Sequence, residues 1–458
     1  MMNTLTVIKS FLIIILLGSL SLAHGQQQPD RSFAEQLTLE QAIDLALKDN
    51  RPVQNARLDV ATFEDRLAAL RTKRLPSFKI TSTISQPLTR FEQTFERGVF
   101  GTFPGTGPIP SEDTTVSSSR NPTAMLNGQI TQPLSQLYRV NLNIKQMELS
   151  RAMSEEELRL KQQSVVNEVK RAYYAVLQTQ SAFQSAEASV RLYRELERIT
   201  GDYVLQQVTL KTEQMEVQTR LAKAEYELLT LTNRLASQKE QLNSLLGRDV
   251  RTEFMVTDGV ETAQFVMRET NLATARERAL AQRPEIRKAK LSVGQARYDR
   301  AIKKSEYIPD VSLSFNYTSP FGYSGILPRS ISGVAVQVEW EVFDWGRRKR
   351  ELAEKGRVIE QAENSVIEAE NQVVMDVHNQ FRRLQESCQL LRIARLSQDA
   401  ARENVQVVAY KYRAQAVLLK DVLQAQTSLA DANYEYQKAL MSFWTAKADF
   451  EKALGEDR

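Results

Sequence analysis

Two segments in the second half of the chain alternate between apolar and polar side chains: Val311–Thr318, with the sequence VSLSFNYT, and Val334–Val342, with the sequence VAVQVEWEV. Because successive side chains of a strand point to opposite faces, each segment would have one apolar and one polar face. Nine or ten residues of such alternation are typical of strands that cross a membrane in a β-barrel. A half-buried strand of a soluble sheet is the alternative, but Trp340, Phe343 and Trp345 at one strand end favour a membrane interface.

The sequence predicts four strands in all, near residues 77–86, 124–132, 310–319 and 333–343. The segment Phe91–Arg120, between the first two strands, is rich in Gly, Pro and Ser and predicts a mobile loop. Four strands cannot close a barrel, and an open sheet edge is prohibitive in lipid. Three chains would supply twelve strands, so we expect a trimeric 12-stranded transmembrane β-barrel.

The rest of the chain predicts helices. Leu39, Ile43, Ala46 and Leu47 have the spacing of one helical face, and this pattern continues toward residue 72. Residues 135–247 contain no proline and a single interior glycine, which indicates very long helices. A helix of about 60 residues would span roughly 90 Å, more than a compact globule needs. We therefore expect a mainly α fold of long antiparallel coiled-coil helices.

The chain also contains an internal two-fold sequence repeat. Pro76 and Pro87 of the first copy correspond to Pro309 and Pro320, and Gly247 corresponds to Gly455. Chance similarity between Ala- and Leu-rich helices would not match such Pro and Gly landmarks. The predicted organisation is a first repeat at 37–250, a linker at 251–269 and a second repeat at 270–455.

The N-terminus predicts export. Lys9 precedes the apolar run Phe11–Leu17, and Ser21-Leu22-Ala23 supplies small residues for cleavage, so residues 1–23 are expected to be a signal peptide. A membrane anchor is the alternative, although the apolar run is short for a bilayer. No run of 18 apolar residues follows, so we expect no membrane-spanning helix.

Composition and residue types disfavour nucleic-acid binding and catalysis. The 458 residues include 60 basic and 56 acidic ones, a balance that offers no concentrated basic face for nucleic acid. Cys388 is the sole cysteine, and His378 is the only histidine certain to remain after export. A Cys/His metal site, a nucleophile–base pair and a Gly-rich phosphate loop are all missing, so we expect no enzyme, no metal and no cofactor.

Several motifs, in order along the chain, resemble the TolC family of outer-membrane efflux proteins. They are Leu37–Ala42 with Ala46-Leu47, Arg283–Ile286 with Ile308–Asp310, Val342–Arg348, and Tyr412 followed by Asp421–Gln426 and Leu429. The resemblance implies a homotrimer in the outer membrane of a Gram-negative bacterium, with an α-barrel tunnel of long helices reaching into the periplasm. It implies outer-membrane lipid, a periplasmic adaptor (membrane fusion) protein and an inner-membrane efflux pump or ABC transporter as partners.

The resemblance also implies sites at the tips of the helical hairpins. The repeat pairs Glu213 with Asp421 and Glu216 with Gln424, at positions that narrow the periplasmic entrance in the family. Three symmetry-related carboxylates at a constriction would favour cations. The alternative is that these side chains belong to a solvated helix face.

The hairpin tips themselves depart from the family. Gln207 and Gln415 stand where a glycine is usual, and Val417 stands where some members have an arginine that pairs with the tyrosine retained here as Tyr412. We predict Gln207, Gln415 and Tyr412 as adaptor-docking residues. The basic run Arg347–Arg350 would mark the junction below the barrel or, alternatively, a solvated helix start.

Two readings without a pore remain open. A secreted coiled-coil scaffold would explain the helices, but it would not explain the amphipathic strands or the ordered repeat. A periplasmic adaptor would need additional domains rich in Val and Gly, which the sequence does not offer.

Overall fold

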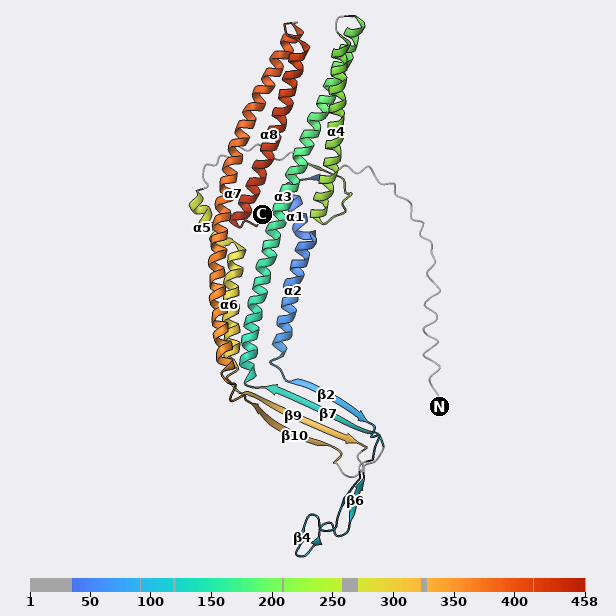
Figure 1. Ribbon diagram of the computed structural model, residues 1–458, viewed down its shortest axis with the longest axis vertical. Helices are drawn as coiled ribbons and strands as arrows, with labels where there is room; N and C mark the ends of the chain where they lie inside the picture. Colours follow the sequence, from blue (N-terminus) through green and yellow to red (C-terminus); the bar gives the residue numbers. More distant parts are fainter. Residues whose placement is uncertain are drawn as a thin grey trace, which may run out of the picture.

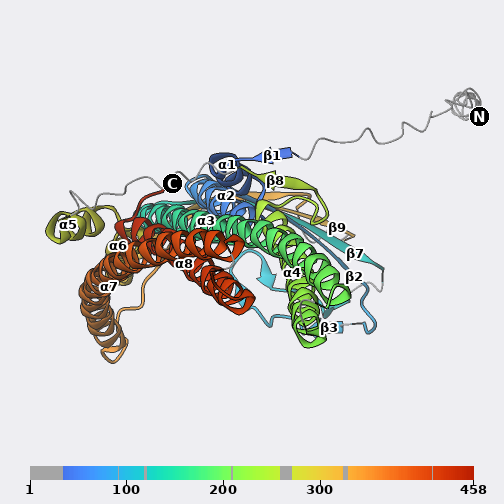
Figure 2. The same ribbon diagram turned by 90° about the horizontal axis from the view of Figure 1, so that it is seen from above.

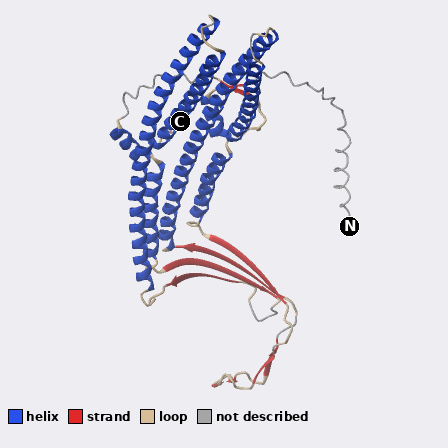
Figure 3. Ribbon diagram, turned by 45° about the horizontal axis from the view of Figure 1, so that its top comes forward, coloured by secondary structure: helices blue, strands red, loops and turns tan. Residues whose placement is uncertain are grey.

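The computed structural model describes residues 35–90, 92–117, 121–207, 210–257, 271–322, 328–414 and 416–457. Long helices run from a four-stranded sheet at one end to two helical hairpin tips at the other (Figure 1). Apart from one short pair of strands among the helices, strands and helices occupy separate parts of the molecule (Figure 3). The prediction of a mainly helical fold with a small β part is confirmed. The predicted signal peptide, residues 1–23, lies outside the described residues.

Two helical hairpins form most of the molecule. In the first, α3 (Gln136–Leu205) packs against α4 (Lys211–Leu246), and in the second, α7 (Arg347–Arg413) packs against α8 (Leu419–Leu454). The long members have 70 and 67 residues and the short members 36 each. Seen from above, the helices follow a curved layer (Figure 2). Among the described residues, none of the helices carries an apolar stretch of the length that a bilayer crossing requires.

Shorter helices extend both hairpins toward the sheet. Helix α2 (Arg51–Thr72) packs along α3, and α6 (Pro284–Ser305) packs along α3 and α7. Each has 22 residues and follows an 11-residue helix, α1 (Leu39–Asp49) or α5 (Leu272–Gln282).

The single helical run expected from Leu39 to residue 72 is wrong, because the chain bends at Asn50. The Asn50 side chain accepts a hydrogen bond from the Val53 backbone N–H at 3.3 Å and donates one to the Leu245 carbonyl at 2.8 Å. Asn50 therefore caps a new helix, and Pro52 lies in the first turn, where its missing N–H costs no hydrogen bond.

The main sheet is antiparallel with the strand order β10-β9-β7-β2. Its strands are β2 (Ser77–Ser85), β7 (Thr123–Pro133), β9 (Asp310–Phe321) and β10 (Ile331–Glu339). All four lie close to their predicted positions. The last was predicted to reach residue 343 but ends at Glu339, because Glu339 pairs with Asp310, the first residue of β9, and no partner continues beyond it.

The register of these strands assembles one apolar and one polar face. Val334 lies beside Phe315, which lies beside Ile130, which lies beside Phe78. One residue along, the corresponding row is Ala335, Ser314, Thr131 and Ser77. The apolar row is open to solvent in the single chain: Phe78 is 75% exposed and Val334 is 70% exposed.

The segment predicted as a loop between the first two strands is folded into two small hairpins. Strand β3 (Glu92–Phe95) pairs with β6 (Thr114–Ser117), and β4 (Thr102–Phe103) pairs with β5 (Gly107–Pro108). They project beyond the end of the sheet that is remote from the helices (Figure 1).

Two hydrophobic cores hold the middle of the helices. The first lies around α1, α3 and α4 and includes Tyr173, whose hydroxyl donates to the Leu37 carbonyl at 3.0 Å. The second lies among α5, α7 and α8, and Trp444 packs against both. Strand β8 (Phe254–Val256) pairs in parallel with β1 (Glu35–Leu37), so the start of the segment predicted as a linker is part of the first core.

Candidate functional site

Both hairpin tips lie at the end of the molecule opposite the sheet (Figure 1). Gln207 closes the α3–α4 tip in the left-handed backbone region, with φ of 59°. This conformation favours glycine and costs other residues about 1–2 kcal/mol. Gln415 lies outside the described residues, and Tyr412 belongs to the last turn of α7. Of the three predicted docking residues, the structure therefore fixes the conformation of Gln207 alone.

The two acidic residues predicted at the entrance occupy equivalent positions. Asp421 is the third residue of α8, and Glu213 is the third residue of α4. Asp421 accepts a hydrogen bond from the Leu418 backbone N–H at 3.0 Å, and both carboxylates lie in first turns, where negative charge is favourable. Helix capping is thus one role of Asp421 within the single chain.

The second predicted pair is arranged differently. Glu216 forms an ion pair with Arg220 of the same helix at 3.1 Å, whereas Gln424 is exposed on α8. Arg220 also donates to the Thr427 hydroxyl of α8 at 3.2 Å. Arg220 therefore connects the two hairpins near their tips and partly balances the charge of Glu216.

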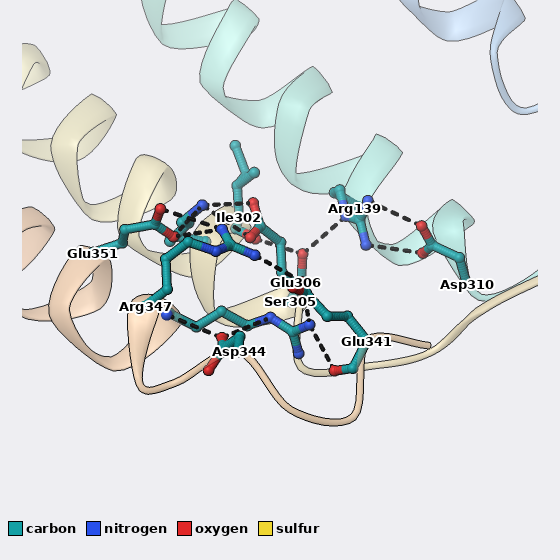
Figure 4. A network of polar contacts seen from close by, with 11 residues as sticks. Arg139, Ile302, Ser305, Glu306, Asp310, Glu341, Asp344, Arg347 and Glu351 are labelled. Carbon is teal, nitrogen blue, oxygen red and sulfur yellow. Dashed lines mark hydrogen bonds and ion pairs between the residues drawn. The ribbon is translucent and has the colours of Figure 1, made fainter. Parts of the chain in front are cut away.

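A polar network at the opposite end of the helices was missed by the sequence analysis (Figure 4). Arg139, in the first turn of α3, donates to both oxygens of Asp310, the first residue of β9, at 2.9 and 3.4 Å. The Ser135 hydroxyl donates to the Pro309 carbonyl and accepts from the Val311 N–H, both at 2.7 Å. These contacts fix the start of α3 against the start of β9.

The basic run at the start of α7 belongs to the same network. The side chain of Arg348 is only 8% exposed, and it contacts Glu341 at 2.8 Å and Asp344 at 3.3 Å. Arg347 pairs with Glu341 at 2.7 Å and with Glu351 at 3.2 Å. The structure thus places this run at the junction of sheet and helices, and Arg348 is enclosed rather than solvated.

Lys303 completes the network from α6, with its ammonium 2.8 Å from Glu351 and 2.9 Å from Glu306.

The cations and N–H groups of this network favour the ionised form of its carboxylates. Hydrogen bonding from Arg348 lowers the pKa of Glu341, and hydrogen bonding from Lys303 lowers the pKa of Glu351. The Arg348 backbone N–H lowers the pKa of Asp344. The short spacing of opposite charges in 341–351 is the sequence signal that could have revealed this network.

The remaining candidates have packing roles. Cys388 packs against the second core, and His378 is half-buried on α7. Within the described ranges, no group of three or more His, Cys, Asp or Glu side chains could hold a metal ion.

Comparison with known proteins adds a family match. The family described as outer membrane efflux protein matches residues 42–248 and 275–456, well over half of the chain. The alkaline protease secretion protein AprF of Pseudomonas aeruginosa is 21% identical over 299 residues. That match covers 65% of this chain and 62% of AprF, so the chain spans less than two thirds of that relative.

Solved structures share the fold. The outer-membrane channel OprN superposes with a TM-score of 0.71 at 17% identity, covering 91% of this chain and 89% of OprN. CusC superposes with a TM-score of 0.71 at 15% identity, covering 95% of this chain and 96% of CusC. At these identities the likeness establishes the fold alone.

Proposed function

Because the chain belongs to the outer membrane efflux protein family, we propose that it is the outer-membrane channel of a tripartite efflux or type I secretion system. It is then the exit duct through which substrates pass from an inner-membrane pump and a periplasmic adaptor to the cell exterior. The sheet lies in the outer membrane, and the helices extend into the periplasm. The chain contributes a passage and no catalysis.

The observation that carries this proposal is the two-faced sheet. Register places Phe78, Ile130 and Phe315 in one row across β2, β7 and β9, and the apolar face that they share is open in the single chain. A contiguous exposed apolar surface of this kind suits contact with lipid. The opposite face, which includes the exposed Gln129 and Gln337, suits a water-filled lumen.

Assembly as a homotrimer follows from the edges of the sheet. Within the described residues, β2 and β10 each have one neighbouring strand, so both present an open edge. Unpaired backbone groups are too costly in hydrocarbon to leave exposed. Pairing β2 of one chain with β10 of the next would join three chains into the 12-stranded barrel.

The helices support a tunnel built from repeated halves. The matched lengths of α1 and α5, α2 and α6, and α4 and α8 support repeats at 37–250 and 270–455. Three curved helical layers such as the one in Figure 2 would enclose an α-barrel. The tips would then form its entrance, with Asp421, Glu213, Glu216 and Gln424 at the aperture. Gln207, Gln415 and Tyr412 would dock the adaptor.

A secreted or periplasmic coiled-coil protein without a pore is disfavoured by the same sheet. Such a protein would cover an apolar sheet face with helices or a second sheet. Here the helices meet the ends of the strands and leave both faces uncovered (Figure 1).

Cysteine cross-linking tests whether β2 of one chain pairs with β10 of the next and so closes the barrel. In a Cys388→Ser background, Thr81→Cys on β2 is combined in turn with Ala335→Cys, Gln337→Cys and Glu339→Cys on β10. One register should bring a pair of Cα atoms within about 7 Å, the reach of a disulfide. Oxidation in native membranes should then give a covalent trimer that does not exceed three chains.

Asn316→Cys on β9 is the matched control. Strand β7 separates β9 from β2, so Thr81→Cys with Asn316→Cys should not cross-link across two strand spacings, about 9.6 Å. A mature chain that is monomeric and stable without detergent would contradict the proposal, as would trimers that conduct no ions in planar bilayers.

A further inference from the structure

The connection from β10 to α7 exposes large apolar side chains. Trp340 is 55% exposed, Phe343 is 69% exposed and Trp345 is 90% exposed. The rings of Phe343 and Trp345 contact edge to face, with centroids 4.8 Å apart. Trp340 continues the apolar positions of β10 beyond its last residue, whereas Phe343 and Trp345 lie in the connection that follows, between the sheet and α7.

The backbone holds Trp345 in this exposed position in a disfavoured conformation. Its φ of 56° lies in the left-handed region, which bulky residues rarely adopt. Asp344 stabilises the turn by accepting hydrogen bonds from the backbone N–H groups of Gly346 at 3.0 Å and Arg348 at 3.1 Å. This left-handed backbone leaves the Trp345 indole 90% exposed, with little packing within the chain beyond Phe343, and points to a partner outside it.

Cations lie directly beside these rings. Arg347 and Arg348 form ion pairs in the polar network at the junction of sheet and helices. Lys349 and Arg350 are exposed, and within the described residues neither of them forms a side-chain hydrogen bond or an ion pair. The helix dipole disfavours positive charge at the start of a helix, so it does not stabilise these two cations within the chain. Lys73, Arg74 and Lys304, at the ends of α2 and α6 nearest the sheet, are exposed as well.

We propose that Trp340, Phe343, Trp345, Lys349 and Arg350, together called the connector patch, bind anionic phospholipid headgroups of the leaflet that faces the helices. Aromatic rings favour the headgroup level of a bilayer, and cations beside them attract anionic lipid. Through Trp340 the patch also adjoins the apolar face of the sheet. This inference rests on the proposed function, because the strands must lie in the membrane for the patch to reach the headgroups.

Quenching of Trp345 fluorescence tests the proposal. The full-length Trp340→Phe protein is reconstituted as a trimer in phosphatidylcholine vesicles, where Trp444 remains in the helical core. Phosphatidylglycerol or phosphatidylethanolamine with brominated acyl chains is then added at equal mole fraction. We expect phosphatidylglycerol to quench more strongly, with a relative association constant roughly fivefold higher.

Paired variants separate headgroup charge from general proximity to lipid. Lys349→Gln with Arg350→Gln should make the two lipids quench equally. Arg392→Gln with Arg395→Gln, an equal change of charge on two exposed residues about 65 Å further along α7, should keep the preference. Trp345→Asn should abolish quenching and leave the trimer intact, because asparagine tolerates left-handed backbone.

The outcomes distinguish this inference from the proposed function. Two results would overturn the connector patch as a lipid site. One is equal quenching by both lipids in the protein that keeps Lys349 and Arg350, and the other is no quenching of Trp345 by either lipid. If the same preparations still form cross-linked, conducting trimers, the channel proposal stands. A failure to form trimers would instead remove the proposed function on which the patch depends.

Discussion

At the sheet end of the helices, Arg348 is enclosed and bound to Glu341 and Asp344, whereas at the hairpin tips Glu216 pairs with Arg220 along an exposed helix face. The first arrangement joins separate elements, namely the end of β10, the start of α7 and, through Lys303, the end of α6. The second lies within one helix, from which Arg220 also reaches across to α8. This difference indicates a rigid junction of sheet and helices and loosely held tips.

The largest expected effect is at Arg348. Arg348→Met should lower the yield of folded trimer in membranes roughly tenfold, because it leaves the carboxylates of Glu341 and Asp344 without their enclosed cation. Quantitative immunoblotting of unheated membrane samples measures the trimer. The matched truncation at the tip, Arg220→Met, should change the yield by less than about twofold. Equal losses from both substitutions would show that the two ends are held alike.

Acid should weaken the junction. The folded-state pKa values of Glu341, Asp344 and Glu351 are lowered by their cationic and N–H partners. These carboxylates therefore contribute their full stabilisation of the fold above their unfolded-state pKa values, ordinarily 3.8 to 4.5. It is lost as the pH falls through the lower folded-state values. The temperature of trimer dissociation should therefore fall steeply between about pH 5 and 3. Arg348→Met should show a shallower fall, and an unchanged pH profile in that variant would count against the network as its cause.

The tips should control ion passage rather than stability. Asp421→Ala with Glu213→Ala should weaken cation preference and block by trivalent cations, since carboxylates in a narrow aperture are screened less than at an open surface. Loss of the Asp421 cap should cost only about 1 kcal/mol. Reversal potentials in planar bilayers under a salt gradient provide the measurement. Unchanged selectivity and block would eliminate the acidic aperture and leave Glu216 as the next candidate.

The smallest effect is expected at Gln207. Gln207→Gly should stabilise the α3–α4 tip by up to about 1 kcal/mol, because glycine adopts the left-handed region without strain. Gln206→Gly is the matched control: Gln206 has an ordinary φ of −82°, so glycine there should bring no gain. Hydrogen exchange of the tip amides measures the local stability. A gain of the same size in both variants would assign the effect to something other than backbone strain.

Periodic features of this fold could be predicted from the sequence. Alternation placed two strands within a few residues of β9 and β10, and Ser, Thr and β-branched side chains placed another at β2. The proline-free composition of residues 135–247 predicted the long helices α3 and α4. Such patterns extend over many residues, so individual exceptions do not hide them. The equivalence of Glu213 and Asp421 also followed from the repeat, although their place in an aperture is still a prediction.

The features that escaped prediction depend on contacts between distant segments. Helix α1 stops at Asn50 because that side chain reaches Leu245, which is 195 positions away. Strand β10 stops at Glu339 because β9 begins at Asp310. The basic run Arg347–Arg350 was predicted to mark a junction or, alternatively, a solvated helix start, but the turn at Trp345 that folds Glu341 and Asp344 around Arg348 was not predicted.

The placement of the two cores gives the hairpins the mechanics of levers. Leu242 and Leu246 anchor the base of α4 in the first core, and Phe450 and Leu454 anchor the base of α8 in the second. From Leu242 or Phe450 each helix then extends about 31 residues to its tip end, a lever arm of about 46 Å at 1.5 Å per residue. A tilt of about 5° at the base displaces such a tip by roughly 4 Å. A small repacking around Trp444, which contacts both cores, would thereby be amplified into a displacement of several ångströms at the tips.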